Sequence, residues 1–201
     1  MTSQQYSTAE NAPGSLAQRV QFQRLEAARG PLAVMAGIAF AATILIAAGE
    51  AFGVLISNTD SAAPAGVYRV IGREVARGDL VAACLPIAVA QAGLARGYLR
   101  TGGCVGNAEP VDKIVGALPG DIVEIEPRWI AINGKRIAHC VTAAHDSTGR
   151  PLTHVAWGKR QVVMNEVWLF GFNDRRSWDS RYFGPIPIAN LRGKLEPVLT
   201  W

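Results

Sequence analysis

Histidine is scarce in this sequence, and the few histidines present lack the setting that catalysis needs. His139, His145 and His154 are the only three among 201 residues, and a Ser-His-Asp triad requires a histidine oriented by a carboxylate. All three lie in a segment of hairpin and loop character. A zinc site from His139, Cys140 and His145 is the alternative, but their spacing matches no common ligand pattern. We therefore expect no metal and no cofactor.

Concentrated positive charge is also lacking. The formal net charge is +4, and the basic residues after position 50 are scattered, apart from the pairs Lys135-Arg136, Lys159-Arg160 and Arg175-Arg176. No basic stripe interleaved with aromatic residues is present, so nucleic acid is not an expected partner. Internal repeats and low-complexity segments are absent.

Charge is entirely missing from one long stretch. Gly30 to Gly49 contains no Asp, Glu, Lys or Arg, and a helix of that length spans ~30 Å, the thickness of the hydrocarbon core of a bilayer. A helix buried in a protein core would normally carry polar residues on its outer face. We expect a transmembrane anchor over residues 30–50.

The residues before this stretch predict its orientation. Arg19, Arg24 and Arg29 indicate that the N-terminal end stays in the cytoplasm. The prediction is a cytoplasmic tail over residues 1–29, disordered over 1–18, and a periplasmic domain over 51–201. A cleaved signal peptide is the alternative, because Ala47 and Ala48 are small, but the apolar run is longer than a usual signal sequence.

Cysteines are few, and all lie on the exported side. In an oxidising compartment two of the three can pair. We favour Cys84 with Cys104, because they flank the stretch Leu94–Gly103 and a disulfide there would contribute ~3 kcal/mol. Cys140 is then left over, and three reduced thiols are the alternative.

Short strands dominate the exported part. Asn133-Gly134 suits a type I′ hairpin within residues 129–137, and long helical patterns are absent after the anchor. The expected class is mainly β, with short helices and one N-terminal transmembrane helix. The other expected elements are strands over 66–71, 79–84, 121–126, 166–172 and 193–199, and a short helix over 87–100.

A Ser-Lys pair is the catalytic chemistry that remains. Ser61 follows the anchor closely among small residues, and Thr59 precedes it by two positions. Lys113 is a lone lysine in an apolar strand; burial would lower its pKa and let it act as a base. Each segment alone also fits an interpretation without a catalytic role, namely a polar turn for Ser61 and a surface position for Lys113.

A third segment, Ser177-Trp-Asp-Ser-Arg181, supports this pair. Asp179 and Arg181 could form an ion pair that fixes the loop, and Ser177 could hold the lysine amine by a hydrogen bond. The interpretation without a catalytic role is a charged turn before a strand.

The three segments together resemble the conserved boxes of the type I signal peptidases (peptidase clan S26), in the same chain order. Ser61-Ala-Ala-Pro64 resembles the nucleophile box, with Thr59 at the oxyanion position, and Lys113 to Asp121 resembles the general-base box. The final segment resembles the box in which Ser177 supports the lysine and Asp179 and Arg181 are structural. Asn58-Thr-Asp-Ser and Arg96-Gly-Tyr-Leu resemble the TraF branch of conjugative-transfer peptidases.

The resemblance implies an inner-membrane serine endopeptidase with a signal-peptidase-like β domain. Its substrate would be an exported, pilin-like precursor with small residues before the cut, and the conjugation or type IV secretion machinery would be a partner. A linear or a cyclic product is possible. A general type I signal peptidase and an inactive, anchored β domain that scaffolds a secretion complex are the alternatives.

Overall fold

A long N-terminal helix precedes a β-rich domain along the chain. The structure is a computed structural model that describes residues 16–52, 54–58, 62–72, 74–138, 140–172 and 176–201. The chain divides into two compact units, Met1–Ala48 and Gly49–Trp201. The predicted site residues fall in the second unit.

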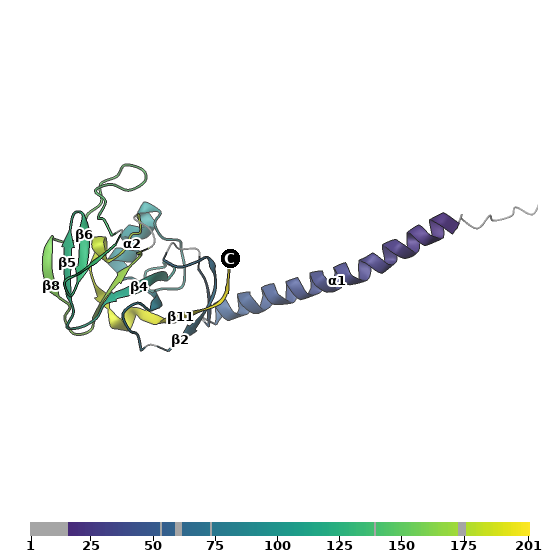
Figure 1. The fold of residues 1–201 in the computed structure, drawn as a ribbon, viewed down its shortest axis with the longest axis horizontal. Coiled ribbons are helices and arrows are strands. Elements are labelled where there is room, and N and C mark those ends of the chain that lie inside the picture. Colours follow the sequence, from purple (N-terminus) through teal and green to yellow (C-terminus); the bar gives the residue numbers. More distant parts are fainter. Residues whose placement is uncertain (1–15, 53, 59–61, 73, 139, 173–175) are drawn as a thin grey trace, which may run out of the picture. The chain divides into compact units, whose positions relative to one another are not determined.

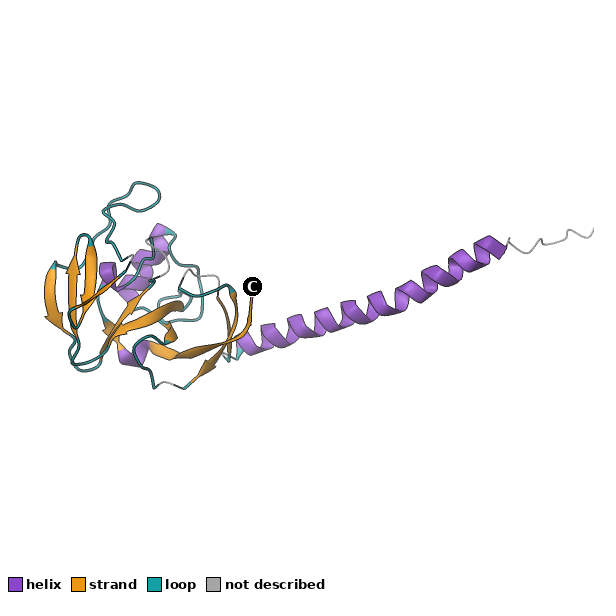
Figure 2. Cartoon of the chain, in the orientation of Figure 1, coloured by secondary structure: helices purple, strands orange, loops and turns teal. Residues whose placement is uncertain are grey.

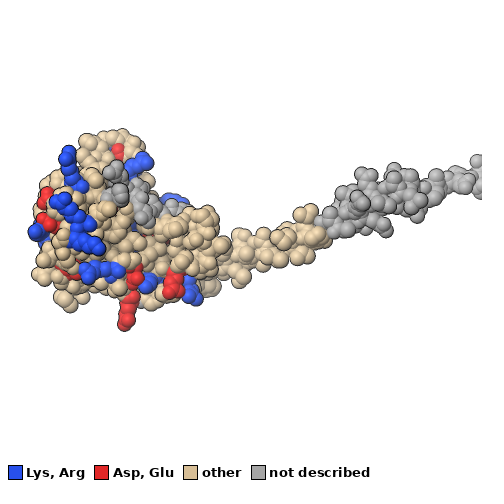
Figure 3. Space-filling view, in the orientation of Figure 1, with Lys and Arg blue, Asp and Glu red and all other residues tan. Residues whose placement is uncertain are grey.

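Helix α1 (Leu16–Ala51) contains the uncharged stretch. Its part Gly30–Ala51 has a mean hydropathy of 2.3 over 22 residues, and none of that window is buried, so it is long and apolar enough to cross a membrane. The described face of this helix in Figure 3 shows neither blue nor red atoms. The helix begins at Leu16. Residues 16–18 are therefore helical, whereas the sequence predicted disorder over residues 1–18.

A seven-stranded sheet forms the larger part of the domain (Figure 1). Its strand order is β1-β2-β11-β3-β4-β9-β10, with every neighbouring pair antiparallel. The last long strand, β11, therefore lies between two early strands. The bounds are β1 (Leu55–Asn58), β2 (Gly66–Ile71), β3 (Leu80–Ala83), β4 (Val111–Ala117), β9 (Glu166–Phe170), β10 (Ile186–Pro187) and β11 (Leu191–Thr200).

A four-stranded antiparallel sheet lies on the other side of the domain, and short helices complete the fold (Figure 2). Asn133 and Gly134, between β6 and β7, have φ of 50° and 79°, which a type I′ turn requires and which an Asn-Gly pair adopts at little cost. The bounds are β5 (Ile122–Glu126), β6 (Trp129–Ile132), β7 (Lys135–Ile137), β8 (Gly158–Gln161), α2 (Ile87–Arg96), α3 (Ser180–Phe183) and the 3₁₀ helix η1 (Ile188–Asn190).

Two main apolar clusters support the sheets. One lies around Val81, Val115 and Leu169 of the larger sheet, and the other around Val123 and Trp168. Strand β4 is an interior strand paired with β3 and β9, and six of its seven residues are buried, so both of its faces are covered. A side chain on this strand is therefore shielded from water whichever face it takes.

The prediction of a mainly β domain with short helices after one N-terminal apolar helix is confirmed. The predicted strand over residues 66–71 has those bounds in the structure, and the closing strand is longer than predicted. Strands β1, β8 and β10 and helix α3 were not predicted.

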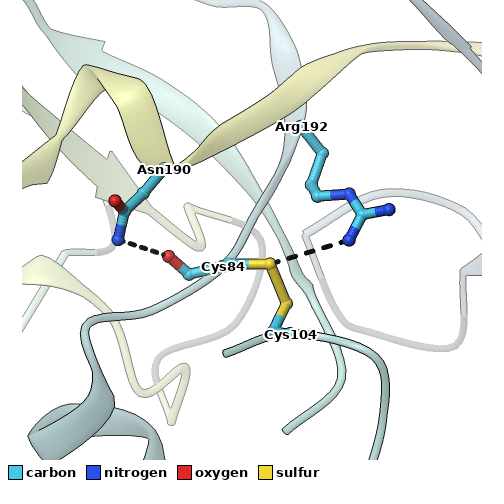
Figure 4. Close-up of a disulfide and its surroundings, with 4 residues drawn as sticks. All are labelled: Cys84, Cys104, Asn190 and Arg192. Atoms are coloured by element: carbon cyan, nitrogen blue, oxygen red, sulfur yellow. Dashed lines mark hydrogen bonds between the residues drawn. A yellow bond between two sulfur atoms is a disulfide. The ribbon is translucent and has the colours of Figure 1, made fainter. Parts of the chain in front are cut away.

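A disulfide joins Cys84 to Cys104, the pair that the sequence favours, and their Cα atoms are 5.5 Å apart. The side-chain amide of Asn190 donates to the carbonyl oxygen of Cys84 at 2.9 Å, and Arg192 Nη1 lies 3.9 Å from its sulfur (Figure 4). The bridge ties the end of β3 to the loop that leads into β4. Cys140 is a free, buried thiol.

Candidate active site

Lys113 is buried near the beginning of strand β4, with 3% of its surface exposed. It lies opposite Val81 of β3 in the register of the sheet. Asp112 immediately before it is 5% exposed, and Ile114 immediately after it is half-buried. The sequence therefore places an amine in the interior of the larger sheet.

Lys113 lines a cavity of about 540 Å³. The wall contains charged, aromatic and aliphatic side chains drawn from β1, β4, the segment after α2, the loop before β8 and the segment before α3. Its lining residues include Ile56, Tyr98, Leu99, Arg100, Glu109, Asp112, Lys113, Ala143, His145, Asp146, Leu152, Ser177, Trp178 and Tyr182. The cavity thus brings Lys113 and Ser177 together from distant parts of the chain.

The predicted nucleophile, Ser61, and the predicted oxyanion donor, Thr59, lie outside the described residues. The segments on either side of them are described. Ile56 of β1 lines the cavity, and Ala62 is 1% exposed. The hydroxyl of Tyr68 donates to the carbonyl oxygen of Pro64 at 2.8 Å, which holds the turn into β2.

Asp179 and Arg181 form a buried ion pair, as the sequence predicts. Arg181 Nε donates to Asp179 Oδ1 at 2.8 Å and Nη2 donates to Oδ2 at 2.7 Å, and neither side chain is exposed. The remaining donors of Arg181 reach the carbonyl oxygens of Val141 and Ser177. Asp179 Oδ2 also accepts the N–H of Gly171. This fork fixes the segment that carries Ser177 against two other segments.

Burial and the charges of this pair shift the pKa of three groups. Burial alone would lower the pKa of Arg181, but the hydrogen bonds and charge of Asp179 raise it above its usual range. Burial raises the pKa of the Cys140 thiol to about 11, although the positive charge of Arg181 opposes the rise. Burial also raises the pKa of Tyr182. All three groups keep their protons near neutral pH.

Ser177 is 5% exposed, but it does not make the bond predicted for it. Its Oγ has no hydrogen-bond partner among the described residues, so the expected bond to the amine of Lys113 is not formed. The side chain instead lies against the backbone of Gly171, where a Cβ atom would overlap Ser177 Oγ. The absence of a side chain at Gly171 gives this hydroxyl its position.

The zinc alternative gains no support from the described part of the chain. There, no group of three or more His, Cys, Asp and Glu side chains is arranged to hold a metal ion. Cys140 is buried in the second apolar cluster, whereas His145 is exposed at the cavity. His139 lies outside the described residues.

Sequence reasoning missed most of the polar and aromatic groups that line the cavity, Asp112, Tyr98 and Asp146 among them. An acidic residue beside the lone lysine of an apolar strand was a usable signal for Asp112. Nothing local marks Tyr98 and Asp146, since the hydrogen bond between them joins residues 48 positions apart.

Comparison with known proteins agrees with the resemblance predicted from the three segments. The family model described as signal peptidase, peptidase S26, matches residues 27–201. Conjugal transfer protein TraF of Agrobacterium fabrum is 41% identical over 147 residues, 72% of this chain and 81% of that protein. Plasmid transfer protein TraF of Escherichia coli is 32% identical over 169 residues, 84% of this chain and 93% of that protein.

A solved structure of a signal peptidase I from Enterococcus faecalis aligns with 61% of this chain and 97% of its own, at 22% identity and a TM-score of 0.36. The match of the family model extends from within α1 to the last residue and includes every predicted site residue. The chain belongs to the signal peptidase family, peptidase S26.

Proposed function

We propose that this protein is a membrane-anchored serine endopeptidase in which Ser61 is the nucleophile and Lys113 the general base. The burial of Lys113 on the wall of the large cavity carries the proposal. A side chain at this position is shielded from bulk water and faces the space that a substrate would occupy. Membership of the signal peptidase family supports the same assignment.

The reaction follows from these two groups. The amine of Lys113 accepts the hydroxyl proton of Ser61 while Ser61 Oγ attacks the scissile carbonyl. The amide N–H of Ser61 and the hydroxyl of Thr59 donate to the oxyanion, an effect of about 3 kcal/mol for one donor. Lys113 then passes its proton to the departing amine, and water hydrolyses the acyl-enzyme by the same route.

The buried pair of Asp179 and Arg181 is structural in this mechanism. Its hydrogen bonds hold the segment that brings Ser177 to the cavity. Ser177 lines the same cavity as Lys113, and the proposed role of its hydroxyl is to hold the lysine amine when substrate occupies the site.

The proposed setting is the periplasmic face of the inner membrane, with α1 as the anchor. The proposed substrate is an exported, pilin-like precursor, and the proposed partner is the conjugation machinery. The names of the two relatives, conjugal transfer protein and plasmid transfer protein, support this role. Attack by an amine of the same substrate chain on the acyl-enzyme, in place of water, would give a cyclic product.

The test uses the full chain in detergent micelles and a precursor peptide that carries small residues before the cut. Ser61→Ala and Lys113→Ala should each abolish cleavage, while the far-ultraviolet circular dichroism stays that of the wild type. A serine-directed acylating inhibitor should label the wild type and not Ser61→Ala. Full activity in either variant would rule out the pair.

Lys135→Ala is the matched control, because Lys135 is an exposed lysine of β7 outside the cavity. It should retain wild-type cleavage. Chelation of zinc should change nothing, and loss of activity on chelation would favour a metalloenzyme. A wild type that neither cleaves nor becomes acylated would favour the scaffold alternative.

A further inference from the structure

The cavity is larger than small substrate residues require. Its volume is about 540 Å³, several times that of one or two methyl-sized side chains. Pockets of roughly 300–1,000 Å³ hold whole drug-sized molecules. The cavity therefore has room for one large side chain beside the main chain of an extended substrate.

One part of the lining is suited to an apolar occupant. Tyr98, Leu99, Leu152, Trp178 and Tyr182 all line the cavity, and together they form what we call the aromatic wall. The rings of Tyr98 and Trp178 are 5.3 Å apart with an angle of 54° between their planes. Trp178 directly follows Ser177, so the aromatic wall is continuous along the chain with the predicted catalytic segment.

A network of hydrogen bonds holds this wall in place. Tyr98 Oη donates to Asp146 Oδ2 at 2.6 Å, and Arg150 Nε donates to the same oxygen at 2.7 Å. Arg150 Nη2 reaches the carbonyl oxygen of Arg96 at 2.8 Å, and Arg96 Nη1 reaches that of Pro151 at 2.9 Å. We call these residues the clasp, because they fasten the loop before β8 to the end of α2.

The carboxylate at the centre of the clasp is saturated with donors. Asp146 Oδ1 accepts from the N–H and hydroxyl of Thr148 and from the N–H of Arg150. Only 6% of the Asp146 side chain is exposed. The Arg150 guanidinium also lies over the Tyr98 ring, 5.5 Å from its centre. Tyr98 is thus held by its hydroxyl and between Arg150 and Trp178.

We propose that the aromatic wall is a recognition subsite for one large apolar side chain of the substrate, with Tyr98 as its specificity-determining residue and the clasp as the device that keeps its shape. The inference rests on the proposed function for its choice of an extended peptide as ligand. An aromatic or branched aliphatic side chain buries its surface against the rings, whereas a small one leaves the cavity partly filled.

The experiment compares peptides that differ at a single position upstream of the cut. Full-length protein in micelles is assayed with Ala, Leu or Phe at each upstream position in turn. At one position the wild type should cleave the Phe or Leu peptide with kcat/KM about tenfold or more above the Ala peptide, mainly through KM. Tyr98→Ala should abolish this preference while still cleaving the Ala peptide, and Tyr98→Phe should retain part of it.

A binding measurement separates this inference from the catalytic one. Ser61→Ala, which cannot cleave, should bind the fluorescent Phe peptide more tightly than the Ala peptide by anisotropy, and adding Tyr98→Ala should equalise the two. Leu152→Trp, which fills the cavity without removing a clasp residue, should reverse the preference. It serves as the second variant if Tyr98→Ala does not fold.

Trp157→Ala is the matched aromatic control, because Trp157 stacks on His154 outside the cavity. It should keep the wild-type preference. Cleavage without a size preference at any position, or a preference that survives both Tyr98→Ala and Leu152→Trp, would overturn the subsite and leave the proposed function standing. Failure of binding and cleavage with every peptide would overturn both.

Discussion

Lys113 and Arg181 are two cationic side chains buried in one domain, and their surroundings suit different tasks. Arg181 is paired with Asp179 through a two-point fork, and its other donors end on backbone carbonyls. A guanidinium held in this way keeps its proton and its position. Lys113 carries a compact amine at a cavity, where a substrate can approach it.

Removal of one partner of the buried pair should be costly. Asp179→Ala would leave the Arg181 guanidinium buried without its counter-charge, and such changes cost about 3–5 kcal/mol. We expect the free energy of unfolding, measured by urea titration of the full chain in micelles, to fall by that amount.

An exposed pair gives the control for this prediction. Arg69 and Glu196 are bridged at 2.9 Å with side chains 58% and 45% exposed. Glu196→Ala should therefore cost less than about 1 kcal/mol. Equal losses in the two variants would contradict a special role for the buried pair.

At the scale of elements, the position of the loop before β8 depends on the carboxylate of Asp146. The hydrogen bond from Tyr98 is the largest cause that holds the pKa of Asp146 well below its usual range, and the N–H of Arg150 acts in the same direction. A lowered folded-state pKa stabilises the protein above the unfolded value of about 3.9, and this contribution is lost as the pH falls through the folded value.

Wild type and Asp146→Asn should therefore differ most in stability near neutral pH. The difference in unfolding free energy should shrink progressively below about pH 4, as the wild-type carboxylate loses its advantage over a neutral side chain. Urea titrations of both proteins at a series of pH values measure it. A difference that does not change with pH would show that the charge of Asp146 is unimportant.

Elements with a strong local signal were predictable, and those defined by distant pairing were not. Asn133-Gly134 predicts its hairpin because only a few residue types accept positive φ at little cost. Strand β8 has the sequence Gly-Lys-Arg-Gln, which is polar and carries no strand pattern, and it forms because it pairs with β5. The insertion of β11 between β2 and β3 has no local signature at all.

The same distinction holds for the candidate site. Lys113 stands out because a lone cation in an apolar strand is rare, and the segment around Asp179 and Arg181 has a recognisable order. The aromatic wall is assembled from three separate segments by tertiary contacts, so neither its members nor its clasp could be inferred from spacing. The absence of the predicted hydrogen bond between Ser177 and Lys113 could not be inferred either, because the position of the Ser177 hydroxyl depends on its packing against Gly171.

At the scale of the whole molecule, the arginines before Gly30 predict the side of the membrane on which the domain lies. In spheroplasts of a Gram-negative host, added protease should digest the domain after α1 and leave the N-terminal tail protected. The full-length mass should persist before digestion. A product that begins after Ala48 and is released from the membrane would instead indicate a cleaved signal peptide.

The place of β11 in the sheet determines when the proposed peptidase can become active. The strand order puts β11 and β3 between the β1–β2 pair, whose connecting segment contains Ser61, and β4, which carries Lys113. β11 also follows β1, β2, β3 and β4 along the chain, so it leaves the ribosome after them. A chain still being synthesised can have both reacting groups but not the strand that joins their halves of the sheet, so under the proposed mechanism the peptidase becomes competent only after β11 has joined the sheet.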